Sequence, residues 1–194
     1  EMLTYEGDFE RADEVSLKSV QLDPKSPIMR WARNNVLWGL GRDDEVVAVC
    51  ETLLLERPDW RLCEAMTFNV TVLREDYAAA RAMLRRMAQP RGAEAVRLAD
   101  DLVDALEGKG DTRAVAEQLV QLNDGTVDPT SLTPLGHPDI VFLLARMGHQ
   151  DLALAKARWF AEAYPHFARA MVFDPHLRAL GCEPGFQELA RELE

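Results

Sequence analysis

The sequence has no run of lysine and arginine residues. Its 22 basic residues are outnumbered by 33 acidic ones, and the formal net charge is -11. A field of that sign repels the phosphate backbone of nucleic acids, so direct binding to DNA or RNA would need a local basic patch. Because the sequence supplies no such patch, we expect no direct nucleic-acid binding by this chain.

Long hydrophobic runs are also missing. The longest unbroken apolar stretches, such as residues 140–145, are far shorter than the roughly 20 residues that span a bilayer. No charged segment followed by an apolar one opens the chain, and we expect no membrane insertion. The chain begins with Glu1 inside a predicted helix, which indicates that it was cut from a longer polypeptide.

Cysteine is scarce, and the three residues present are Cys50, Cys63 and Cys182. An odd and sparse set argues against a disulfide framework, and it leaves the compartment open between the cytoplasm, which we favour, and the periplasm. Cys50 and Cys63 lie on successive predicted helices and could pair. A cysteine on an apolar helical face nevertheless usually fills core space.

Sequence motifs for catalysis are absent. The four histidines lack the helical spacing of paired metal ligands, and there is no nucleophile elbow, phosphate loop or dinucleotide fingerprint. We therefore predict a non-enzymatic protein with no catalytic residues, no metal site and no cofactor. The alternative is a metal-dependent hydrolase site, which would be built from His166, His176, Asp174 and Cys182.

What the sequence does contain is a repeat of 34 residues. Gly7 is followed at that interval by Gly41, and Pro24 by Pro58. Small or apolar residues recur with the same period at Ala12, Val46, Ala80 and Ala114, and a further copy covers residues 148–165. Such a fixed period is the sequence signature of a repeat architecture.

Apolar residues within each copy recur three and four positions apart, as in Val46, Val49, Cys50, Leu53 and Leu54. This spacing predicts amphipathic helices, and no alternating stretch predicts a strand. Glycine favours the left-handed conformation that closes a helix, and an aspartate just after it can cap the next one. The pairs that fit are Gly7 with Asp8, Gly41 with Asp43, Gly110 with Asp111 and Gly148 with Asp151.

A 34-residue helical hairpin closed by a proline resembles the tetratricopeptide repeat, and residues 7–26 are similar to its second helix. The resemblance implies an all-α, right-handed superhelix of about five hairpins with a C-terminal capping helix. We expect one continuous domain: hairpins over residues 1–122, the first of them truncated, a Pro- and Gly-rich loop over 123–138, and a last hairpin plus cap over 139–194.

The C-terminal segment resembles the end of tetratricopeptide arrays in bacterial multidomain regulators, on the residues Asp174, Pro175, Leu180, Pro184 and Phe186. Gly181 and Gly185 replace the two arginines of that element. The resemblance implies an array attached to a winged-helix transcriptional regulator, an adenylyl cyclase or a protein kinase domain. Phe186 and Leu189 would close the last hairpin as a cap.

The expected binding site is the concave groove. Trp31, Asn35 and Trp38 share one face of a predicted helix, and Asn69 lies 34 residues after Asn35. Stacked amides at Asn35 and Asn69 would hydrogen-bond a peptide backbone, although the two tryptophans could instead be buried between hairpins. We therefore expect a protein- or peptide-binding module of a regulator. The alternative is a structural module for self-association into a homo-oligomer.

Overall fold

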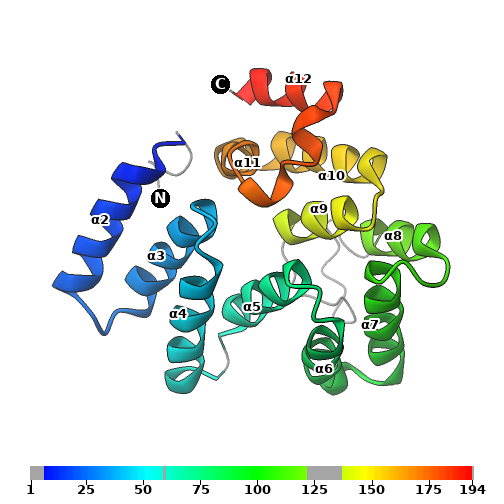
Figure 1. The fold of residues 1–194 in the computed structure, drawn as a ribbon, viewed down its shortest axis with the longest axis horizontal. Coiled ribbons are helices and arrows are strands. Elements are labelled where there is room, and N and C mark those ends of the chain that lie inside the picture. Colours follow the sequence, from blue (N-terminus) through cyan, green and yellow to red (C-terminus); the bar gives the residue numbers. More distant parts are fainter. Residues whose placement is uncertain (1–6, 59, 122–136, 194) are drawn as a thin grey trace. The chain divides into compact units, whose positions relative to one another are not determined.

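The computed structural model describes residues 7–58, 60–121 and 137–193. Within these ranges the chain is helical and contains no strand (Figure 1). The α-helices are α2 (Phe9–Leu22), α3 (Pro27–Gly39), α4 (Asp43–Glu56), α5 (Arg61–Leu73), α6 (Tyr77–Ala88), α7 (Ala93–Leu106), α8 (Thr112–Gln121), α9 (His137–Arg146), α10 (Gln150–Ala163), α11 (Pro165–Val172) and α12 (Pro184–Leu193). Three short 3-10 helices are η1 (Gln89–Arg91), η2 (Pro175–Leu177) and η3 (Leu180–Cys182).

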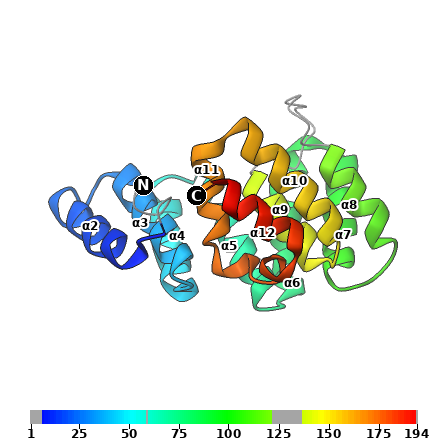
Figure 2. The same ribbon diagram turned by 90° about the horizontal axis from the view of Figure 1, so that it is seen from above.

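Helices that follow one another in the sequence pack against one another. Contacts join α2 to α3, α3 to α4, α6 to α7, α7 to α8, and α11 to α12. The pairs α2 with α3 and α6 with α7 lie side by side in both views (Figure 1 and Figure 2). This arrangement confirms the all-α prediction and is consistent with a helical repeat array.

The described residues fall into two compact units. The first unit comprises Glu1–Thr67 and Arg158–Glu194, and the second comprises Phe68–Ala157. The domain boundaries expected from the sequence stay a prediction. Most of the predicted loop over 123–138, like residues 1–6, lies outside the described residues, and its last two positions belong to the first turn of α9.

Two of the predicted glycine turns have the same hydrogen-bonded closure. Gly41 and Gly148 take φ values of 67° and 82°, which the missing side chain makes inexpensive. The residue after each glycine donates its N–H to a carbonyl five positions earlier, at 2.9 Å from Arg42 to Leu37 and at 3.0 Å from His149 to Leu144. The repeated turn at the ends of α3 and α9 is therefore a Schellman motif.

Aspartate caps follow only some of these glycines. The carboxylate of Asp8 accepts the N–H of Arg11 at 3.2 Å, and that of Asp111 accepts the N–H of Ala114 at 3.0 Å. The expected cap at Asp43 is wrong, because α4 begins at Asp43 and its N-cap residue is Arg42. Asp43 lies inside the first helical turn instead, where its charge still favours the positive end of the helix dipole.

Close contact between α2 and α3 depends on Gly39. A side chain at this position would overlap the ring of Phe9. Arg33, which is 8% exposed, adds polar contacts between the same helices, since it donates to the carbonyl oxygen of Asp13 and to the hydroxyl of Ser16, both at 3.0 Å.

We predict that Gly39→Ala lowers the free energy of unfolding by about 1–3 kcal/mol, the usual cost of overpacking a filled interior. Gly181→Ala is the matched control, because the added Cβ meets no atom within 4 Å and φ is not positive there. Urea denaturation followed by circular dichroism measures both variants. Equal stability of the two variants would contradict the close packing of Phe9 on Gly39.

Candidate functional site

The structure places the four predicted binding residues in different surroundings. Trp31, Asn35 and Trp38 lie on α3 in the first unit, whereas Asn69 lies in the second unit. Trp31 is half-buried and packs against the buried residues Cys50, Leu53 and Cys63. Asn35 is partly exposed.

Asn69 is directed into the interior of the second unit. It is 2% exposed, and its Nδ2 donates a hydrogen bond to Oδ1 of Asp139 at 2.5 Å. Its own Oδ1 is buried and has no hydrogen-bond partner among the described residues. A joint role of Asn35 and Asn69 in binding a peptide stays a prediction.

Trp38 contacts a segment that is distant in the sequence. Its indole Nε1 donates a hydrogen bond to Oδ2 of Asp174 at 3.0 Å. Its ring centroid lies 4.1 Å from that of His176, with the two ring planes tilted by 52°. The C-terminal segment around η2 thus packs on the aromatic face of α3 within the first unit.

Asp174 accepts a second hydrogen bond, from within its own segment. Its Oδ1 accepts the backbone N–H of His176 at 2.9 Å, which caps η2. The residue is partly buried, but its carboxylate is enclosed, and burial raises the pKa of Asp174 above its ordinary value of 3.8. The hydrogen bonds from Trp38 and His176 and the charge of His176 oppose this shift, because they favour the ionised form.

His176 connects the same segment to α4. Its Nε2 lies 3.3 Å from Oδ1 of Asp43, and its side chain is 10% exposed. Pro175 lies nearby, at 3.9 Å from where a Cβ on Gly41 would stand. The turn between α3 and α4 is therefore covered by residues that the sequence analysis assigned to the terminal cap. No local pattern could have indicated this contact, since Trp38 and Asp174 are 136 residues apart.

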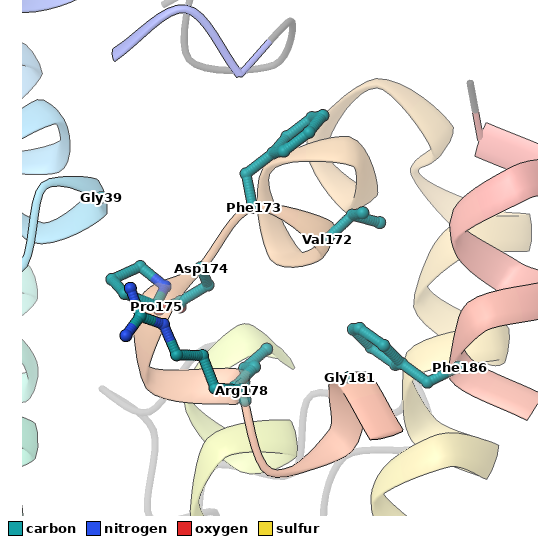
Figure 3. A pocket seen from close by; sticks show the side chains of 9 residues that line it. Gly39, Val172, Phe173, Asp174, Pro175, Arg178, Gly181 and Phe186 are labelled. Carbon is teal, nitrogen blue, oxygen red and sulfur yellow. The ribbon is translucent and has the colours of Figure 1, made fainter. Parts of the chain in front are cut away.

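A pocket of about 310 Å³ opens beside these contacts. Figure 3 shows Asp174 and Pro175 next to the Gly39 turn, with Phe186 of α12 on the other side. Val172 and Leu177 add apolar surface, and the exposed Arg178 supplies a positive charge. The lining thus combines apolar surface with one carboxyl group, that of Asp174, and one guanidinium group, that of Arg178.

Other site classes find no support in the described residues. Among the side chains that the structure describes, no three His, Cys, Asp or Glu are grouped as they would be around a metal ion, and the side chain of His166, part of the alternative hydrolase site, lies outside that set. None of the helices described there is long and apolar enough to cross a membrane. Comparison with known proteins gave no significant match to a family model, a curated protein or a solved structure.

The raised pKa of Asp174 predicts a specific pH dependence. The folded chain holds a proton on Asp174 more tightly than the unfolded chain does. The free energy of unfolding should therefore fall as the pH rises from the ordinary range of an aspartate, about 3.9, through the pKa of folded Asp174. We expect this fall to be absent in Asp174→Asn, whose amide keeps an oxygen that can accept the Trp38 N–H.

Thermal unfolding across the acidic range, taken as the difference between variant and wild type, isolates the Asp174 contribution from those of other carboxylates. Asp101→Asn removes one exposed negative charge and serves as the control. If the difference curve for Asp174→Asn is as flat as that for Asp101→Asn, the carboxylate is not enclosed as described.

Proposed function

We propose that this chain is a non-enzymatic module that binds a peptide or a protein segment, built as a right-handed superhelix of tetratricopeptide type. The 34-residue period supports the proposal, and so does the sequential packing of the helices. The matching turns at Gly41 and Gly148 give two hairpins the same closure. An array of such hairpins offers a continuous surface on which an extended chain can lie.

The contact between Trp38 and Asp174 carries the proposal furthest. The indole N–H of Trp38 donates a hydrogen bond to the carboxylate of Asp174, and the indole ring lies against His176, two residues after Asp174. The segment held in this way has an aspartate followed by a proline. This face of α3 therefore has the donor and the aromatic surface that an acidic, extended peptide requires.

The energy needed for such binding is modest. A micromolar contact corresponds to about 8 kcal/mol of binding free energy. Tryptophan is among the residues that contribute most at interfaces, and a partly exposed amide such as that of Asn35 can pair with a peptide backbone. An incoming peptide carboxylate would compete with Asp174 for Trp38. By resemblance, the module would transmit binding to an attached domain of a bacterial transcriptional or signalling regulator.

Selection from a displayed library of random peptides tests the proposal. We expect peptides with an aspartate followed by a proline to be enriched, and Trp38→Ala to weaken their binding by roughly tenfold or more, as truncation of an interface tryptophan usually does. Trp38→Phe keeps an aromatic ring without the N–H and should have a smaller effect. Asp174→Asn should strengthen binding, because its neutral amide oxygen is a weaker acceptor than a carboxylate and competes less for the Trp38 N–H.

Trp159→Ala is the matched control, since it removes a partly buried tryptophan from α10 rather than from α3. Titration calorimetry with the selected peptides measures every variant, and circular dichroism verifies that each one is folded. Peptides that bind Trp38→Ala, Asn35→Ala and wild type equally well would refute this assignment.

Self-association is the second candidate function, and exposed apolar side chains favour it. Val15 and Leu22 on α2 are 51% and 80% exposed, and Ile28 on α3 is 64% exposed. Val15 and Leu22 are seven residues apart and so lie on one face of α2, and an exposed apolar face is a common feature of protein interfaces.

If this surface joins two copies of the chain, we expect the wild type to sediment as an oligomer at micromolar concentration. Leu22→Glu combined with Ile28→Glu should then sediment as a monomer, because a charge at each position would be buried in the interface. Sedimentation velocity distinguishes the two states. A wild type that is already monomeric would exclude this function for the isolated chain.

A further inference from the structure

Two buried thiols lie together where α4 meets α5. Cys50 and Cys63 are both 0% exposed and belong to one cluster with Leu53. Both are free cysteines. Trp31, Trp60 and Met66 pack against the same cluster.

A buried polar side chain lies beside these thiols. Asn34 is 0% exposed, and its Nδ2 donates to Sγ of Cys50 and to Sδ of Met66, each at 3.1 Å. Its Oδ1 is buried and accepts no hydrogen bond from the residues that the structure describes. Core filling alone does not require a fully buried amide aimed at a sulfur, because a leucine of similar volume would avoid the cost of leaving that oxygen unpaired.

Charge and hydrogen bonding make the two thiols unequal. The pKa of Cys50 is lowered, first by a hydrogen bond from Cys63 and then by hydrogen bonds from Thr67 and Asn34, although burial opposes the shift. The pKa of Cys63 is raised by the same shared hydrogen bond and by burial, while the charge of Arg30 lowers it. Of the two thiols, Cys50 is therefore the one that loses its proton more readily, and the thiolate is the reactive form of cysteine.

We propose that Cys50 and Cys63 are a redox-active pair that a hydroperoxide converts into an intramolecular disulfide between α4 and α5. Cys50 is the attacking residue and Cys63 the resolving one, and Asn34 is a positioning residue that stabilises the Cys50 thiolate.

The reaction balances in two steps. The Cys50 thiolate attacks one oxygen of hydrogen peroxide, so that an S–O bond forms, the O–O bond breaks, and hydroxide leaves to become water. The sulfur of Cys63 then attacks the resulting sulfenic acid, so that the S–S bond forms, the S–O bond breaks, and a second water is released. Two thiols are oxidised and one peroxide is reduced, with no other reactant.

Burial sets the conditions for this chemistry. At 0% exposure the thiols react only when the helices around them open briefly, which makes the pair slow but protected from larger oxidants. Once formed, the disulfide would join helices from two successive hairpins covalently. Trp31, a predicted binding residue, packs directly on this cluster, so the disulfide would change its surroundings.

The test treats the folded chain with hydrogen peroxide, quenches it in denaturant with a thiol alkylating reagent, and identifies modified peptides by mass spectrometry. We expect Cys50 and Cys63 to be protected together in one cross-linked peptide pair that dithiothreitol releases. In Cys63→Ala, dimedone should label Cys50 as a sulfenic acid, because the resolving thiol is gone. In Cys50→Ala, dimedone should leave Cys63 unlabelled.

Asn34→Leu tests the positioning role. Its rate of Cys50 alkylation should fall by roughly tenfold, the factor expected for one hydrogen bond to a charged group, and the apparent pKa of Cys50 in the alkylation pH profile should rise. Thr52→Val, an exposed change on the same helix as Cys50, is the control and should leave both quantities unchanged.

The exposed Cys182 provides an internal standard. The peroxide treatment continues after Cys182 is fully oxidised, for as long as a thiol reagent needs to alkylate Cys50 in the folded chain. If Cys50 and Cys63 are still reduced at that time, or if any disulfide formed includes Cys182, the proposal is overturned. Dimedone labelling of Cys63 rather than Cys50 would overturn the assigned roles.

Discussion

The helices that the structure describes have apolar faces that none of them can cover alone. The helices are short, and isolated helices of such length are marginal in water, so packing rather than propensity stabilises them. Contacts with sequence neighbours cover α2, α3 and α4 in this way, and likewise α6, α7 and α8, and the tight turn at Gly41 keeps α3 close to α4. Sequential packing meets this requirement, because each helix of an adjacent pair covers part of the apolar face of the other.

In the first unit, some contacts join segments that are distant in the sequence, and polar side chains make these contacts. The indole of Trp38 holds Asp174, and His176 reaches Asp43 at the start of α4. A carboxylate enclosed in this way costs free energy, as the raised pKa of Asp174 indicates. A purely apolar contact would avoid that cost, so we expect the polar contact to specify which segment packs there rather than simply to add stability.

Local features of the fold were predictable from the sequence, and distant contacts were not. The helices and the turns at Gly41 and Gly148 follow from spacing and from the conformational freedom of glycine, both of which act over a few residues. The partner of Trp38 lies 136 residues away, and no periodicity reports it. The sequence also did not show which asparagine of α3 faces inward. Asn34 is the buried amide, while its neighbour Asn35 is partly exposed, and a spacing rule does not distinguish two adjacent residues in this respect.

Helix α3 connects the two sites. Trp31 and Asn34 face the thiols of Cys50 and Cys63, while Trp38, two turns along from Trp31, holds Asp174. A rigid helix transmits a shift at one end to the other, because its backbone hydrogen bonds resist bending and its neighbours are close-packed. A covalent bond between α4 and α5 would change the surface against which Trp31 packs. The hydrogen bond from Trp38 to a carboxylate, at the other end of α3, would then change in strength. Under the two proposals, oxidation of the thiol pair and peptide binding are therefore linked through α3. Such linkage is reciprocal: if oxidation changes the peptide affinity by some factor, a bound peptide changes the equilibrium constant for oxidation by the same factor.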